Sequence, residues 1–109
     1  MQKPEIVITD NGFAIVTAKS ADAVSLDEVR AIVAYKLDEL TTDLVCCDIV
    51  TSAADGEQIR TIHEELLGFD AAMKAFEALT GFDRQWRDAV VLPPFAMNRT
   101  VIYDRAACA

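Results

Sequence analysis

The sequence predicts an α+β domain, in which an antiparallel sheet of about five strands carries C-terminal helices packed on one face. Three observations lead to this fold class. An Asn-Gly pair stands between two β-branched runs, a largely apolar run covers Leu44–Thr51, and a helical stripe of apolar residues follows Gly68. Short β-branched runs with tight turns are typical of antiparallel strands, and an apolar period of about 3.6 residues is typical of a helix with one packed side.

Length and charge limit the classes of function. The 109 residues are enough for a single domain, residues 1–109, and 52% of them are hydrophobic, which argues against disorder. The net charge of −8 disfavours binding to nucleic acid or to an anionic membrane, so we expect neither as a partner. The first residues lack the apolar core of a signal peptide and three cysteines make no disulfide framework, so we expect a cytoplasmic protein.

Residues 5–18 predict an N-terminal hairpin. The runs EIVIT and FAIVTA flank Asp10-Asn11-Gly12, and Asn-Gly favours a two-residue loop in which both residues have positive φ. A loop at Asn11-Gly12 would pair Ile8 with Ile15 and Val7 with Val16. Residues 19–23 then form a polar connection.

The segment from residue 26 to 40 has two interpretations. Ser25 and Glu28 have the spacing of a capping box, and apolar residues at helical intervals would extend a helix to about Leu40. The β-branched and aromatic residues of the same segment prefer a strand. We favour one helical turn at Leu26–Val29 followed by a strand to about Leu37.

The central strands are expected within residues 31–63. Leu44–Thr51 is a strand under either interpretation, buried on at least one face. A turn follows at residues 53–56, and Glu57–His63 forms the last strand of this group. A helical region at 69–91 contains one helix with an apolar stripe, ended by Gly81, and a second short helix capped by Asp83. Residues 92–105 are an extended C-terminal segment with an edge strand at Thr100–Tyr103.

A polar cluster within the central strands is the first candidate site. It includes Tyr35, Lys36, Asp38 and Asp43, which together could hold a small anion or another ligand. Polar turns more often satisfy their own backbone, so this cluster also fits a structural turn between two strands. His63 extends the candidate to a ligand or enzymatic site, but no second histidine stands at the spacing of a metalloprotease.

A second candidate lies in the C-terminal quarter. Trp86, Arg87 and Arg99 would form an interface hot spot if exposed together, whereas Trp86 would otherwise complete the core. The arginines of this quarter are expected to pair with the acidic body of the protein. No Gly-rich phosphate loop and no metal-ligand spacing is present, so we expect no cofactor and no metal.

The chain resembles a group of small uncharacterised bacterial proteins. The resemblance rests on AYKLDELTTD at residues 34–43, on Gly68-Phe69-Asp70 before a helix, and then on Trp86, Val90, Pro94-Phe95, Asn98 and Thr100 in order. It implies a half barrel similar to a pleckstrin-homology domain. Proteins of this build are sometimes immunity proteins that neutralise a toxin, so the resemblance also implies an immunity-like function.

These features favour a non-enzymatic protein-binding domain. Its acidic surface would meet a basic protein partner, or an exposed sheet edge would form a homodimer. The alternative is a small-ligand or enzymatic domain with a site near Lys36, Asp38, Asp43 and His63.

Overall fold

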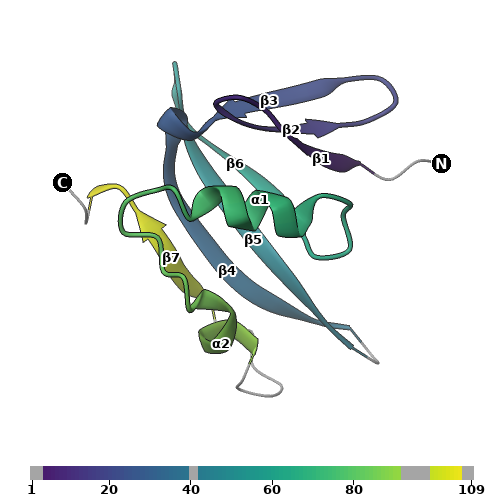
Figure 1. Ribbon diagram of the computed structural model, residues 1–109, viewed down its shortest axis with the longest axis vertical. Helices are drawn as coiled ribbons and strands as arrows, with labels where there is room; N and C mark the ends of the chain where they lie inside the picture. Colours follow the sequence, from purple (N-terminus) through teal and green to yellow (C-terminus); the bar gives the residue numbers. More distant parts are fainter. Residues whose placement is uncertain (1–3, 40–41, 92–98, 107–109) are drawn as a thin grey trace.

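The computed structural model describes residues 4–39, 42–91 and 99–106. Within them the chain forms two antiparallel sheets and two α-helices, so the α+β class is confirmed. Sheet A has the order β1-β2-β3 and sheet B the order β6-β5-β4-β7 (Figure 1). The expectation of one sheet of about five strands is only roughly met, because the N-terminal strands form a separate sheet of their own.

Sheet A consists of β1 (Glu5–Ile8), β2 (Gly12–Val16) and β3 (Ala21–Ser25). The predicted hairpin is present, but its register differs by two residues, with Ile8 opposite Phe13 and Ile6 opposite Ile15. The two-residue loop is Asp10-Asn11, and the Thr9 amide donates to the Gly12 carbonyl across it (3.0 Å).

Gly12 lies inside β2 for a reason of space. A Cβ there would collide with the backbone carbonyl of Val24 on β3. The close approach of β3 therefore requires a glycine at position 12, the same residue from which the sequence predicted a turn. The expectation of a polar connection at residues 19–23 is wrong, because β3 already begins at Ala21.

A short 3₁₀ helix, η1 (Leu26–Glu28), connects the two sheets and carries the predicted capping box. The Ser25 hydroxyl accepts the Asp27 amide (3.3 Å), and the Glu28 carboxylate accepts the Ser25 amide (3.2 Å). The chain then enters β4 (Val29–Glu39), so the strand interpretation is confirmed and the long helix is excluded.

Sheet B is built on β4 and β5 (Thr42–Ala53), with β6 (Gly56–His63) on one side and β7 (Thr100–Asp104) on the other. The turn predicted at residues 53–56 joins β5 to β6. In β7 a bulge between the partners of Ile32 and Val33 leaves Ile102 as an extra residue. Ile102 and its neighbour Tyr103 both belong to the core as a result.

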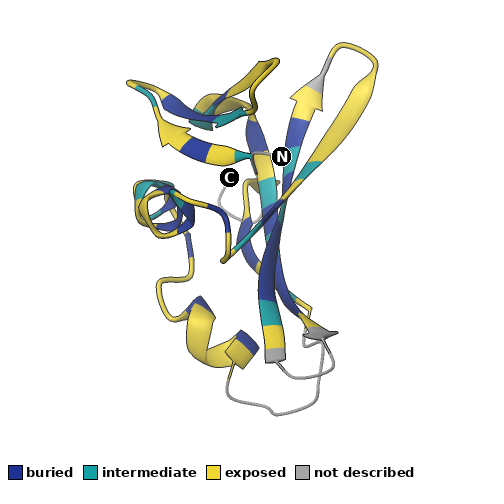
Figure 2. Ribbon diagram, turned by 90° about the vertical axis from the view of Figure 1, so that its right-hand side faces the viewer, coloured by how far each residue is buried: buried dark blue, intermediate teal, exposed yellow. Residues whose placement is uncertain are grey.

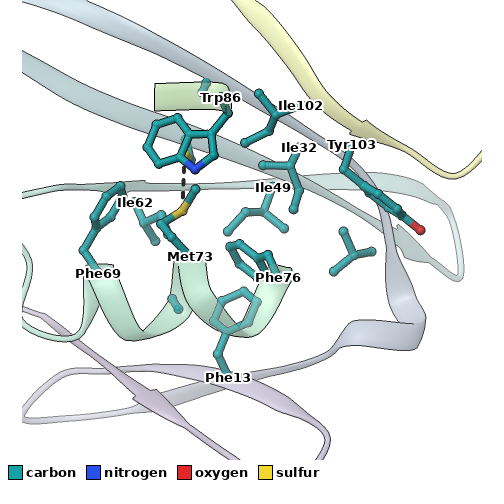
Figure 3. Packing of buried hydrophobic residues seen from close by; sticks show 14 of the residues in the cluster. Phe13, Ile32, Ile49, Ile62, Phe69, Met73, Phe76, Trp86, Ile102 and Tyr103 are labelled. Carbon is teal, nitrogen blue, oxygen red and sulfur yellow. Dashed lines mark hydrogen bonds between the residues drawn. The ribbon is translucent and has the colours of Figure 1, made fainter. Parts of the chain in front are cut away.

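One face of sheet B, here called the inner face, is covered by sheet A and by the helices α1 (Phe69–Phe76) and α2 (Trp86–Val91) (Figure 2). The predicted stripe of α1 is confirmed for its buried residues Phe69, Ala72, Met73 and Phe76, but the helix ends at Phe76 and does not reach the predicted end at Gly81. Phe76 meets Phe13 of sheet A edge to face at 5.5 Å between ring centroids, which joins both sheets and α1 in one core (Figure 3).

No helix in the described ranges is long and apolar enough to cross a membrane. The opposite face of sheet B, here called the outer face, is not covered by any described helix or strand (Figure 2).

Candidate interaction surface

Strand alternation defines the residues of the outer face. Buried core residues such as Ile32, Cys47 and Ile62 mark the inner face, so their neighbours along each strand point outward. The described outer-face residues are Ala31, Val33, Tyr35, Leu37, Leu44, Cys46, Asp48, Val50, Ser52, Glu57, Ile59, Thr61, His63, Val101 and Asp104.

Large apolar side chains on this face are exposed. Ile59 of β6 is 63% exposed and Val101 of β7 is 59% exposed, while Leu37 of β4 is 40% exposed. Ile59 and Val101 occupy the two edge strands of sheet B. The outer face therefore presents apolar groups at both of its edges.

A hydrogen-bonded polar group occupies the centre of the face. The Tyr35 hydroxyl and the Thr61 hydroxyl both donate to Oδ1 of Asp48, each at 2.8 Å. These residues come from β4, β6 and β5, so Asp48 ties three neighbouring strands together. Burial, then the hydrogen bond and the charge of Asp48, raise the pKa of the Tyr35 phenol to about 12.

Arg99 completes this central group. One guanidinium nitrogen lies 3.5 Å from Oδ2 of Asp48, and the guanidinium carbon lies 5.3 Å from the centre of the Tyr35 ring. A cation over an aromatic face is held by the ring quadrupole as well as by the carboxylate. Two predicted binding residues, Tyr35 and Arg99, thus meet on the outer face, and the acidic partner expected for Arg99 is Asp48.

His63 shares the outer face with Cys46, its partner in register on β5. Its Nδ1 accepts the backbone amide of Glu65 (3.3 Å), which places the ring proton on Nε2 in the neutral tautomer. Cys46 is only 2% exposed, so its sulfur is shielded from the surface. Within the described ranges no group of three or more metal-ligating side chains converges.

The polar cluster predicted around Lys36 is divided by the sheet. Lys36 neighbours Tyr35 along β4 and therefore points to the inner face, where it is only 3% exposed. Its ammonium lies 3.4 Å from Asp43 and donates to the carbonyl of Val91 on α2 (3.2 Å). Asp38 stands opposite Asp43 in register, but its side chain lies outside the described part.

The alternative site therefore does not assemble. Lys36 and Asp43 form an ion pair on the inner side, whereas His63 lies on the outer face. A base on one face and an ammonium on the other cannot act on the same small molecule.

The second candidate is also divided. Trp86 is 6% exposed and packs against Met73 in the core, as one of the two alternatives predicted (Figure 3). The guanidinium carbon of Arg87 lies 5.0 Å from the centre of the Trp86 ring, and one of its nitrogens lies 3.6 Å from Oδ1 of Asp70 on α1. Trp86 and Arg87 thus lie on the helix side of the molecule, away from Arg99. There they line part of a shallow depression of about 200 Å³.

Several residues of the outer face were missed by the sequence reasoning. Asp48 and Thr61 carry the central group, and Ile59 and Val101 provide the exposed apolar surface. Alternation along Glu57–His63 puts Ile59, Thr61 and His63 on one side of the strand, and this is the signal that the sequence offers. Nothing in the sequence indicated that this side would be the uncovered one.

Comparison with known proteins adds no assignment, since no family model, no curated protein and no solved structure matches the chain.

Proposed function

We propose that the chain is a non-enzymatic protein-binding domain whose partner packs on the outer face of sheet B. The supporting observation is the exposure of Ile59 and Val101 at the two edges of a sheet face that no described helix or strand covers (Figure 2), around Arg99 and the largely buried Tyr35. Tyrosine and arginine are enriched among the residues that dominate binding energy at protein interfaces.

The rigidity of the central group supports the same function. Tyr35 is hydrogen bonded to Asp48 and covered by Arg99, so its ring is already held in one position before a partner arrives. Binding to a surface that is ordered beforehand costs less conformational entropy. A partner would therefore meet a preformed platform between two apolar edges.

The divided placement of the titratable groups supports binding over catalysis. An enzymatic site requires a base or nucleophile within hydrogen-bond reach of its partner groups. Lys36 with Asp43 and His63 face opposite sides of sheet B. An immunity-like function and a basic partner remain predictions that rest on the resemblance and on the net charge of −8.

Affinity capture with surface variants tests the proposal. Tagged wild-type protein should capture a protein, the untagged chain itself included, and Ile59→Asp or Val101→Asp should abolish the capture because each places a charge in the apolar contact. Leu67→Asp is the matched control, since Leu67 is 72% exposed but lies outside sheet B. Equal capture by all four proteins, or none by wild type, would overturn the proposed function.

A further inference from the structure

We infer that the occupant of the outer face is a second copy of this chain, so that two molecules pack face to face as a twofold-symmetric β-sandwich. The inference rests on the proposed function, because it names the partner of the same surface. It is carried by the charge of the face, by its size, and by the placement of Ile59 and Val101 on opposite edges.

The charge of the outer face differs from that of the whole protein. The described side chains on it or reaching it carry three carboxylates, Asp48, Glu57 and Asp104, and two guanidinium groups, Arg30 and Arg99. Two ion pairs, Arg30–Glu57 and Arg99–Asp48, neutralise most of this charge.

The described side chains of this face therefore sum to a net −1, against −8 for the chain. A basic partner would gain its electrostatic attraction elsewhere on the molecule, since this face offers almost no negative potential. Two copies of an almost neutral face can approach each other without strong repulsion, whereas two copies of the acidic surface cannot.

The size of the face fits a stable dimer. Four strands about 4.8 Å apart, with roughly eight residues at ~3.3 Å each along the central pair, make an area of about 19 by 26 Å. This is on the order of 500 Å² before side-chain relief is counted, and a standard interface takes about 800 Å² of accessible surface from each partner. Covering the whole face with an equal face would give a contact of this class.

Twofold symmetry brings the exposed apolar groups together. A twofold axis lying in the interface and running along the strands places β6 of one copy over β7 of its partner, because these are the two edges of sheet B. Ile59 stands at the level of Ala31, and Val101 stands opposite Val33, two residues further along β4.

The angle of about 30° between packed sheets shifts the edges by a few Å along the strands. Ile59 of one copy lies over the β7 edge that carries Val101 of the other, about two residues (~7 Å) apart along the strands and within reach of long side chains, twice in each dimer. The central group of Tyr35, Asp48 and Arg99 lies between these two contacts.

Light scattering over a concentration series, combined with charge complementation, tests the inference. Wild-type protein should be a dimer. Ile59→Glu and Val101→Lys should each raise the dimer dissociation constant by ~100-fold or more, because symmetry introduces each charge twice into an apolar contact. Leu67→Glu, outside the face, should leave the dimer unchanged.

Mixing the two variants should restore the dimer. A mixed pair has one Glu–Lys contact and one wild-type Ile59–Val101 contact, so it should form far more tightly than either variant forms with itself. Restoration also shows that both variants fold, which circular dichroism checks independently. A mixture that stays monomeric although both variants are folded overturns the inferred contact.

The two proposals fail separately. A wild-type monomer at every concentration, or a dimer that Ile59→Glu and Val101→Lys leave intact, overturns the second copy as the occupant. The proposed function still stands in that case if capture of another protein depends on Ile59 and Val101. Loss of that dependence as well overturns both.

Discussion

Asp48 joins three strands through hydrogen bonds to Tyr35 and Thr61, and it also forms an ion pair with Arg99. These four side chains form the polar centre of the outer face. The Asp48 carboxylate faces the sheet surface next to a phenol, so the phenolate form of Tyr35 is doubly disfavoured, by burial and by the neighbouring negative charge. We expect this raised pKa to affect the titration of Tyr35 and the stability of the protein at alkaline pH.

We expect Tyr35 to ionise near pH 12, above the ordinary value of about 10 for tyrosine. Between these two values the unfolded chain releases a proton that the folded chain keeps. The contribution of Tyr35 to the free energy of unfolding is therefore fully present below pH ~10 and is lost as the pH rises towards 12. Tyr103→Phe leaves Tyr35 as the only tyrosine, and phenolate absorbance then reports its titration.

Asp48→Asn should lower the titration midpoint of Tyr35 in this background, since it removes the negative charge but keeps the size of the side chain. A folded-state midpoint near 10 before this substitution would contradict the role given to burial and Asp48.

Lys36 is a buried charge whose ammonium contacts Asp43 and the Val91 carbonyl. Asp43→Ala should lower the free energy of unfolding by ~2 kcal/mol, somewhat less than the usual cost of breaking a buried pair because Asp43 is partly exposed. The double variant Lys36→Met with Asp43→Ala should recover most of this loss, since a long apolar side chain fills the same volume. Urea denaturation measures both, and equal losses in the single and double variants would contradict this account.

At the scale of elements, tight backbone contacts decide where strands and helices begin. Gly68 precedes α1 with φ of 90°, and a Cβ there would collide with the carbonyl of Ile6 on β1. The Ile6 amide donates to the neighbouring Leu67 carbonyl (2.7 Å), so sheet A and the start of α1 are joined through this contact. Both the positive φ and the lack of space require glycine.

Gly68→Ala should therefore destabilise the protein by ~3 kcal/mol, through strain and displacement of β1. Gly56→Ala is the matched control, because Gly56 has φ of 134° but nothing lies within 4 Å of the added Cβ. Its cost should be limited to backbone strain, ~1 kcal/mol. Thermal or urea unfolding compares the two variants, and equal losses would show that the contact with Ile6 is unimportant.

At the scale of the whole molecule, the two sheets are joined by side chains as well as by η1. Arg60 of β6 binds Asp22 of β3 through two nitrogens, at 2.6 and 3.1 Å, and donates to Thr51 at 2.7 Å. The hydrogen bond to Asp22 is the main cause of a raised pKa at Arg60. Bidentate geometry makes this pair stronger than an ordinary surface ion pair.

Asp22→Asn should lower stability by ~1 kcal/mol, and added salt should reduce the difference from wild type. Asp70→Asn is a suitable comparison, since the Asp70–Arg87 pair is longer (3.6 Å) and Asp70 is almost fully exposed. Its effect should be close to zero. A double-mutant cycle with Arg60→Ala would show no coupling if the pair did not join the sheets.

Local signals in the sequence were sufficient for most elements. The capping box of Ser25 and Glu28, the turn at residues 53–56 and the apolar stripe of α1 each depend on residues a few positions apart, and each is present. The register of the first hairpin was wrong because Gly12 serves the approach of β3, a contact that the Asn-Gly pattern does not contain.

The sequence by itself determined the α+β class, the alternation of each strand and the residue types available for a site. Only the tertiary structure decided that the strands divide into two sheets, and that sheet A and both helices cover the same face of sheet B. Alternation places Tyr35 and Lys36 on opposite sides of β4 but does not say which side will be covered. That choice is made by long-range packing, which buried Lys36 with Asp43 and left Tyr35, Asp48 and Arg99 on the open face.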